Sequence, residues 1–311
     1  MAELLSLPWS ESAPATTAVL NALTIDVEEY FQVSGFDSVI DRADWDNLPT
    51  RVGSATELLL ERFAEANVRG TFFVLGWLAE RQPSLVRAIR AAGHEIGCHS
   101  YHHRLVYEQT PAEFRDDLRR GLDAIEDAIG ERVTLYRAPS FSITARSAWA
   151  LDILIEEGIR IDSSIYPVHH DRYGMPNAPI NPHRLDRPSG TLWEFPPPVM
   201  RFWGVNLPAG GGGYFRFAPY LYTRWALGRI NADGRPFSVY LHPWEVDPEQ
   251  PRVACGWRQR FRHYTGLNRT EGRLIRLLRD FHFGTLSEAL QAYDPKFRVE
   301  PNRAIPVRQA A

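Results

Sequence analysis

Two short segments contain side chains that could bind a metal ion and move a proton. The segment HSYHH at 99–103 places His99 and His103 four residues apart, and a helical turn would put both imidazoles on one face, within reach of one ion. The segment DVE at 26–28 supplies two carboxylates. These lie on the same side of an extended chain, so one can bind a metal while the other stays free. Each segment alone has an ordinary explanation, as exposed or capping histidines and as an acidic loop.

Short apolar segments alternate with helical patterns through the first half of the chain. The clearest helix is predicted to begin at the capping box of Thr110 and Glu113 and to end at Gly130, and an earlier helix to begin at a similar pattern of Ser54 and Glu57. This alternation is typical of a mainly parallel sheet, open or closed into a barrel, with helices outside. The predicted strands are 18–25, 71–76, 94–99, 133–137, 159–162 and 237–241.

In such folds the chemistry lies at the carboxyl ends of the strands. Five reactive side chains fall at or just beyond the end of a predicted strand: Asp26, His99, Arg137, Asp162 and His242. A single arginine in such a place is usually a surface ion-pair partner, and an aspartate before two serines is usually a cap. The functional interpretation therefore depends on the set of five, which packing alone does not explain.

Five sequence motifs occur in the order and approximate spacing of those of a known enzyme family. They are TIDVE at 24–28, HSYHH at 99–103, YRAPS at 136–140, DSSIY at 162–166 and YLH at 240–242. The chain therefore resembles the polysaccharide deacetylases, the carbohydrate esterase family 4 enzymes with a NodB homology domain. The resemblance implies an α/β fold, a distorted (β/α) barrel of the NodB type with a C-terminal extension.

The resemblance covers nearly the whole chain. LHPWE at 241–245, GGGYFR at 211–216 and the arginine-rich segment 256–269 look like the subgroup found with exosortase (PEP-CTERM) and exopolysaccharide gene clusters. We therefore expect three parts, which are an N-terminal arm, the deacetylase domain and a family-specific extension packed on it, at 1–19, 20–250 and 251–311.

The resemblance implies a divalent metal ion held by three protein ligands, Glu28, His99 and His103. Zinc is the first expectation, with cobalt, nickel or manganese as alternatives. A metal with three protein ligands keeps positions for water and a substrate oxygen, and it lowers the pKa of bound water toward about 7. The family usually has Asp-Asp where this chain has Asp-Val-Glu-Glu. Glu29 therefore remains an alternative to Glu28 as the carboxylate ligand.

The resemblance also implies roles for the remaining residues at this edge. Asp26 is the expected general base, and His242 is the expected acid that protonates the leaving amine. Arg137 is expected to hold the base carboxylate, and Asp162 to keep His242 protonated. A backbone N–H near Ser140 is expected to stabilise the oxyanion together with the metal.

Substrate contacts are expected from the third and fourth motifs and from aromatic side chains that could stack on sugar rings, although core packing accounts for most aromatic residues. The candidates are Pro139, Ser140, Phe141, Tyr166, Trp193, Tyr214 and Trp244. The segment 167–219 is rich in proline and glycine and would suit the wall of a cleft. The glycines at 210–213 lack the GK[ST] of a phosphate-binding loop and indicate a turn or lid.

Composition and charge narrow the partners. The formal net charge is -3, which provides no basic field for nucleic acid or for an anionic membrane. Between Arg252 and Arg279 the chain has eight arginines and one acid, Glu271. These arginines could bind an anionic ligand or form a solvated face with internal salt bridges.

Two cysteines fit a reducing compartment. The start of the chain has no charged signal region, so we expect a cytoplasmic protein without stable membrane insertion, or one peripheral to the inner membrane.

The sequence therefore predicts a metal-dependent N-deacetylase acting on an acetylated polysaccharide, oligosaccharide or precursor. Two alternatives stay open. One is a hydrolase of small amides or ureides from the same superfamily, like the allantoinases, and the other is a glycan-binding protein without turnover. The sugar and the oligomeric state are not determined by the sequence.

Overall fold

A computed structural model describes residues 19–170 and 172–298. The predicted N-terminal arm, 1–19, and the end of the predicted extension, 299–311, lie outside these residues except for Val19. The main sheet has nine strands in the order β10-β1-β2-β3-β4-β5-β7-β6, with β11 also paired to β1. The strands are β1 (Leu20–Val27), β2 (Thr71–Val74), β3 (Glu95–Cys98), β4 (Leu135–Tyr136), β5 (Ile161–Asp162), β6 (His183–Arg187), β7 (Gly190–Glu194), β10 (Ser238–Leu241) and β11 (His282–Gly284).

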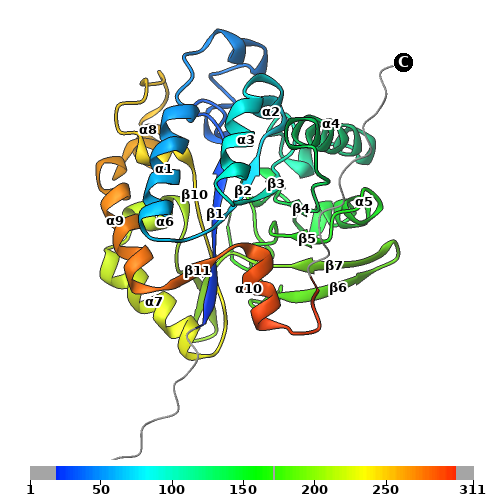
Figure 1. Cartoon of the computed structure of the whole chain (residues 1–311), viewed down its shortest axis with the longest axis vertical. Helices are drawn as coiled ribbons and strands as arrows, with labels where there is room; N and C mark the ends of the chain where they lie inside the picture. The colour runs from blue at the N-terminus through cyan, green and yellow to red at the C-terminus, as the bar shows by residue number, and fades with distance from the viewer. Residues whose placement is uncertain (1–18, 171, 299–311) are drawn as a thin grey trace, which may run out of the picture.

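Helices surround this sheet, with α4 and α5 on one flank and α7 and α9 on the other (Figure 1). The helices are α1 (Val52–Glu65), α2 (Gly76–Arg81), α3 (Pro83–Ala91), α4 (Pro111–Ile129), α5 (Ala150–Glu156), α6 (Gly212–Phe217), α7 (Tyr220–Ala232), α8 (Trp257–Tyr264), α9 (Leu267–Asp280) and α10 (Leu286–Tyr293). A separate antiparallel pair, β8 (Val199–Phe202) and β9 (Val205–Pro208), follows the main run of strands. No helix among the described residues is long and apolar enough to span a bilayer.

The predicted α/β class is confirmed, and so are the six predicted strands, although β4 and β5 are short. Within the described residues every pairing in the main sheet is parallel except that of β6 with β7. Parallel strands buried on both faces need apolar side chains throughout, and β1 and β2 are buried along almost their whole length. The end strands of the order, β10 and β6, are not paired with each other in this part of the chain, so backbone hydrogen bonds do not close the sheet into a barrel.

The two predicted helix starts had different outcomes. Thr110 and Glu113 form the predicted capping box at α4, and Gly130 ends this helix with a φ of 74°. The second predicted helix is present as α1, but its predicted capping box is wrong, because the helix begins at Val52 and the Ser54 hydroxyl donates to the carbonyl of Arg51 instead. The amides at this helix start are satisfied by a carboxylate from a distant part of the chain, described below, so a local capping box is not needed.

The C-terminal segment completes the sheet beside β1. Strand β11 runs parallel to β1, with Leu20 opposite His282, and α10 packs against β1. Helix α9 packs against the turn Pro243–Val246 that follows β10. These contacts bring the segment beyond residue 250 close to the candidate site, while the division of the chain into three parts stays a prediction.

Candidate active site

The five side chains predicted at one edge of the sheet are carried there by parallel strands. Asp26 is near the end of β1, and Asp162 is the last residue of β5. His99, Arg137 and His242 each directly follow a strand, β3, β4 and β10 respectively. Because these strands run in the same direction, their carboxyl ends meet at one edge, as the sequence predicted.

Glu28, His99 and His103 form a buried cluster whose potential ligand atoms all lie within 4.8 Å of one another. Glu28 Oε2 lies 2.8 Å from His103 Nε2. Glu28 Oε2 and His103 Nδ1 are buried, and neither has a hydrogen-bonding partner among the described residues. A buried carboxylate is costly unless a cation compensates its charge, and the nitrogen and oxygen atoms gathered here fit a divalent metal.

The electrostatics of this cluster favour metal binding. Burial by itself raises the pKa of Glu28, but the charges of His103 and His242 outweigh it and hold the pKa well below its usual range. Burial lowers the pKa of His99 to about 4, so its imidazole is neutral at pH 7. His99 Nδ1 lies 2.8 Å from the carbonyl of Arg137, and donation there leaves the Nε2 lone pair available to a metal.

The HSYHH segment reaches this geometry without the helical turn that we predicted. Ser100 and His103 have positive φ angles of 67° and 53°. The Ser100 hydroxyl accepts from the amide of His103 at 3.2 Å, and the Asp117 carboxylate on α4 accepts from the amides of Tyr101 and His102 at 2.9 and 3.1 Å. Side-chain acceptors therefore replace helical hydrogen bonds and hold an irregular loop in which the two histidines meet.

The contacts at the start of α1 distinguish Glu28 from Glu29 as the candidate carboxylate ligand. The Glu29 carboxylate accepts from the amides of Arg51 and Val52 at 2.9 and 3.2 Å, where a negative charge is also favoured by the helix dipole. Glu28 faces the histidines instead, and Trp244 Nε1 donates to its Oε1 at 3.0 Å. The structure therefore favours Glu28 as the carboxylate ligand.

Asp26 lies beside the cluster and is held by Arg137. The guanidinium of Arg137 is completely buried and donates from Nη1 to Asp26 Oδ1 at 2.7 Å. It also donates to the hydroxyls of Thr24 and Ser163, both at 2.8 Å, and lies over the ring of Phe73. A buried charge with this many partners is well compensated, so the Asp26 carboxylate has a fixed orientation.

His242 approaches both carboxylates from the end of β10, the neighbouring parallel strand of β1. Its Nε2 lies 3.8 Å from Asp26 Oδ2 and 3.7 Å from Glu28 Oε1, which places the two acids on the same side of β1, as predicted. Burial lowers the pKa of His242, but Glu28, its hydrogen bond to Glu245 and Asp26 together raise it to about 9. The imidazole is therefore positively charged at pH 7.

The carboxylate partner of His242 is Glu245, which corrects the role predicted for Asp162. Glu245 Oε2 lies 3.0 Å from His242 Nδ1 and accepts from the His242 amide at the same distance. Arg216 donates to the other Glu245 oxygen at 2.6 Å. His242 and Glu245 are three residues apart in LHPWE, and this spacing could have predicted their contact from the sequence.

Asp162 pairs with another buried acid instead. It lies opposite Glu194 in the parallel register of β5 and β7, and the Ser164 hydroxyl donates to it. Burial raises the pKa of Asp162 to about 6 and that of Glu194 well above its usual range. We conclude that Glu194 keeps its proton and donates to Asp162, because two adjacent buried carboxylates cannot both be charged.

This acid pair predicts how stability depends on pH. A carboxyl whose pKa is raised by folding contributes most stability below its unfolded pKa of about 4 and loses that contribution as the pH rises through the folded value. We expect this pair alone to lower the free energy of unfolding by on the order of 2 kcal/mol as the pH rises from about 4 to above about 6, seen as the difference between wild type and a variant in which position 194 does not titrate. Denaturant unfolding at a series of pH values measures this dependence.

A Glu194→Gln variant is expected to make the fall shallower, because the amide donates to Asp162 without titrating. Glu57→Gln, at an exposed position of α1, is the matched control and should retain the wild-type pH dependence. An equally steep fall in the Glu194→Gln protein would contradict the assignment.

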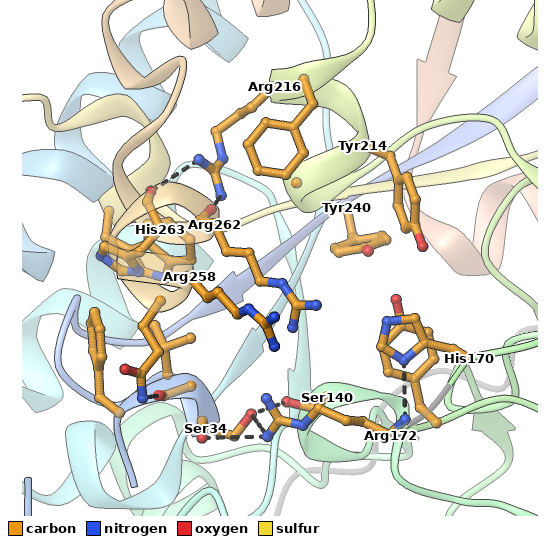
Figure 2. A pocket seen from close by; sticks show the side chains of 18 residues that line it. Ser34, Ser140, His170, Arg172, Tyr214, Arg216, Tyr240, Arg258, Arg262 and His263 are labelled. Atoms are coloured by element: carbon orange, nitrogen blue, oxygen red, sulfur yellow. Dashed lines mark hydrogen bonds between the residues drawn. The ribbon is translucent and has the colours of Figure 1, made fainter. Parts of the chain in front are cut away.

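A pocket of about 620 Å³ opens beside the site, a size typical of small-molecule and glycan sites. Of the residues predicted to contact substrate, Ser140, Tyr214 and Trp244 line it. Figure 2 shows Tyr214 and Ser140 on opposite sides of the open space. Ser140 has a positive φ of 52° and its hydroxyl lies 2.7 Å from that of Ser34.

The other predicted substrate contacts are corrected. Phe141 and Tyr166 belong to a buried aromatic cluster with Tyr240, so they support the pocket without lining it. Trp193 packs against Phe297 in a different part of the core. Sequence alone does not separate packing aromatics from exposed ones, because both are apolar and rigid.

The substrate contacts predicted for Trp244 and Pro139 are also corrected. The Trp244 ring is stacked on His242 and on His263 and is 5% exposed, so little of it remains for a sugar. Pro139 is buried in the turn that carries Ser140 and does not line the pocket.

The glycines at 210–213 also differ from the predicted turn or lid. Gly211 has a φ of 94°, and a Cβ there would lie 2.3 Å from the Tyr240 ring. This run therefore lets the start of α6 pack directly on Tyr240, which lines the pocket.

Comparison of the sequence with protein-family models finds two matching segments. Residues 44–154 match the polysaccharide deacetylase family, and residues 163–291 match a domain of unknown function, DUF3473. Residues 44–154 are therefore similar to the polysaccharide deacetylases, and most of the second half of the chain is similar to a domain without an assigned function.

Curated relatives match over short segments. The peptidoglycan-N-acetylmuramic acid deacetylase PdaA of Bacillus subtilis is 32% identical over 27% of this chain and 32% of its own length. The chitooligosaccharide deacetylase of Bradyrhizobium sp. is 30% identical over 31% of this chain and 42% of its own length. The chain thus spans less than half the length of these relatives.

Comparison of folds covers nearly the whole chain. A putative polysaccharide deacetylase from Mycobacterium smegmatis has a TM-score of 0.59 and 20% identity, and covers 93% of this chain and 96% of its own. Puue allantoinase has a TM-score of 0.61 and 16% identity, with 93% and 94% covered. These similarities confirm the fold.

Proposed function

We propose that this protein is a metal-dependent hydrolase that removes acetyl groups from N-acetylated amino sugars of a polysaccharide or its precursor. The observation that carries this proposal is the cluster of Glu28, His99 and His103 with Asp26 alongside it and His242 facing both acids. The names of the matching relatives, which are peptidoglycan and chitooligosaccharide deacetylases, support the same reaction.

A divalent ion held by Glu28, His99 and His103 would polarise the acetamide carbonyl and make a water molecule more acidic at neutral pH. The mixed nitrogen and oxygen donors favour zinc, with cobalt, nickel and manganese as alternatives. The remaining steps belong to the other side chains. Asp26 accepts the proton of the attacking water, and Arg137 keeps the accepting carboxylate in place.

His242 completes the reaction. As an imidazolium it donates its proton to the sugar nitrogen while the C–N bond breaks, so that acetate and a free amine leave. In the turn at Ser140, the amides of Phe141 and Ser142 donate to the carbonyls of Ala138 and Pro139. We therefore assign the N–H of Ser140 as the donor to the developing oxyanion.

The contact of Glu245 with His242 allows this mechanism to be tested through the pH dependence of activity. His242 is an acid only while protonated, so activity falls as the pH rises through its pKa of about 9. We expect Glu245→Gln to remove one of the charges that raise this pKa and to move the alkaline limb of kcat/KM downward by about one pH unit, which lowers kcat/KM about fivefold at pH 9 and about tenfold at higher pH.

The exposed neighbour Glu249 provides the matched control, because Glu249→Gln alters the same segment without touching His242. An alkaline limb that stays in place in the Glu245→Gln enzyme would show that Glu245 does not act on His242.

The substrate is tested by comparing N-acetylated chitotetraose with a panel of small amides and ureides that includes allantoin. Release of acetate from the tetrasaccharide is the expected result, since the pocket exceeds the volume that a small amide would fill. Hydrolysis of allantoin to allantoate, or of another small amide in the panel, without acetate from the glycan would support the small-amide alternative. Glycan binding without release of acetate from any acetylated glycan would support an inactive binder.

We further propose that the natural substrate belongs to exopolysaccharide synthesis and that the enzyme acts in the cytoplasm or at the inner membrane surface. This rests on the resemblance of LHPWE, GGGYFR and segment 256–269 to the exosortase-associated subgroup. The match of residues 163–291 to a domain of unknown function covers these same segments.

A further inference from the structure

Three arginine side chains enter the pocket from two separate parts of the chain. Arg258 and Arg262 are four residues apart on α8 and therefore project from the same face of the helix. Arg172 enters from the loop after β5 on the opposite side. Figure 2 shows the three guanidinium groups directed into the same open space.

These charges have no carboxylate partners in the described part of the chain. None of the three forms an ion pair there, and the pocket lining among these residues contains no aspartate or glutamate. By contrast, Arg216 in the same wall is neutralised by Glu245, and Arg273 donates to backbone carbonyls at the end of α6. The three pocket arginines therefore leave a concentrated positive charge facing solvent, where an anion would be attracted.

Arg172 is also held in position. Its Nη2 donates to the carbonyl and the hydroxyl of Ser34 at 3.3 and 3.1 Å. Ser34 in turn contacts the hydroxyl of Ser140, in the turn beside the candidate catalytic residues. A guanidinium fixed in this way loses less conformational entropy when it binds a ligand.

The arginine pocket and the catalytic edge share a wall. Trp244 lines the pocket and donates to Glu28, a proposed metal ligand, and Ser140 lines it from the other side. A glycan with its acetamide at the metal site would therefore place a neighbouring group among the arginines.

We propose that the substrate is an acidic glycan, whose negatively charged group next to the N-acetylated sugar is bound by Arg172, Arg258 and Arg262. This inference rests on the proposed function and specifies its substrate class. Guanidinium groups bind carboxylates and phosphates through paired, charge-assisted hydrogen bonds. The charged group is therefore a uronate carboxylate within the chain or a diphosphate at its reducing end.

The test compares binding of three probes to the whole protein by calorimetry at low and at raised salt. The probes are N-acetylated chitotetraose, which is neutral, a hyaluronan tetrasaccharide, which carries carboxylates, and UDP-N-acetylglucosamine, which carries a diphosphate. We expect at least one anionic probe to bind about tenfold more tightly than chitotetraose at low salt, with a smaller difference at raised salt. The tighter of the two identifies the source of the charge.

The double variant Arg258→Gln/Arg262→Gln is expected to lose this preference, with affinity for the anionic probe falling about tenfold or more. Arg260→Gln is the matched control, since Arg260 is exposed on the same helix and does not line the pocket. Circular dichroism checks that each variant is folded. Equal binding of all three probes by wild type, or an equal loss in Arg260→Gln, would overturn the proposal.

Acetate release from the same probes separates this inference from the proposed function. Release from chitotetraose without any preference for anionic probes would refute the acidic substrate and leave the deacetylase intact. Arginine-dependent binding of an anionic probe without acetate release from any probe would refute the deacetylase and leave the anion site.

Discussion

An Asp26→Asn variant is expected to release acetate about 10³-fold more slowly than wild type, because an amide cannot accept the proton of the attacking water. The side chain keeps its size and its contact with Arg137 Nη1 through the remaining oxygen. The loss should therefore appear in kcat, with a smaller change in KM, in steady-state assays of acetate release from chitotetraose.

Two controls make this result specific. Bound zinc should stay at the wild-type level, since Asp26 is beside the ligand cluster and not one of its members. Asp116→Asn, an exposed change on α4, should retain wild-type kcat. If Asp26→Asn retained wild-type kcat, Asp26 would not be the base.

The second large effect concerns the metal. Replacing His103 with alanine is expected to weaken zinc binding by more than about 100-fold, because removing a direct ligand should cost more than removing a residue that only hydrogen-bonds to a ligand. Acetate release should then be abolished at ordinary zinc concentrations. Treatment of wild type with a chelator should have the same effect, and added zinc should restore activity only in wild type. Metal analysis after dialysis measures the first expectation.

The adjacent His102 offers the matched control. Its side chain is 37% exposed and lies 3.5 Å from Asp117, outside the cluster. His102→Ala should therefore retain bound zinc and activity. Equal zinc loss in both variants, or full zinc retention in His103→Ala, would mean that the cluster does not hold the metal.

The contact of Glu245 with His242 was not predicted from the sequence motifs. The family resemblance implied that Asp162 keeps His242 protonated. In the fold, Glu245 is three residues away on the same turn, while Asp162 is turned toward Glu194 by the register of β5 and β7. Register between strands that are far apart in the chain depends on packing of both faces, which one sequence does not display.

The arginines of the C-terminal segment give a second case. Their number was evident from the sequence, but their roles were not, because a solvated face and a binding site have the same composition. Only the position of α8 beside the pocket separates Arg258 and Arg262 from Arg260, which does not line it.

The family resemblance supplied the metal ligands, His99 and His103 with Glu28 or Glu29. By itself the sequence determined the parallel α/β architecture and the edge of the sheet where the reactive residues lie. These follow from local patterns, since apolar runs form buried strands and residues just after parallel strands meet at one edge. The tertiary structure decided the orientations: Glu29 at the start of α1, Trp244 between two histidines, and Glu245 on His242. Each depends on which distant atoms satisfy a buried polar group, and that is settled only when the chain has folded.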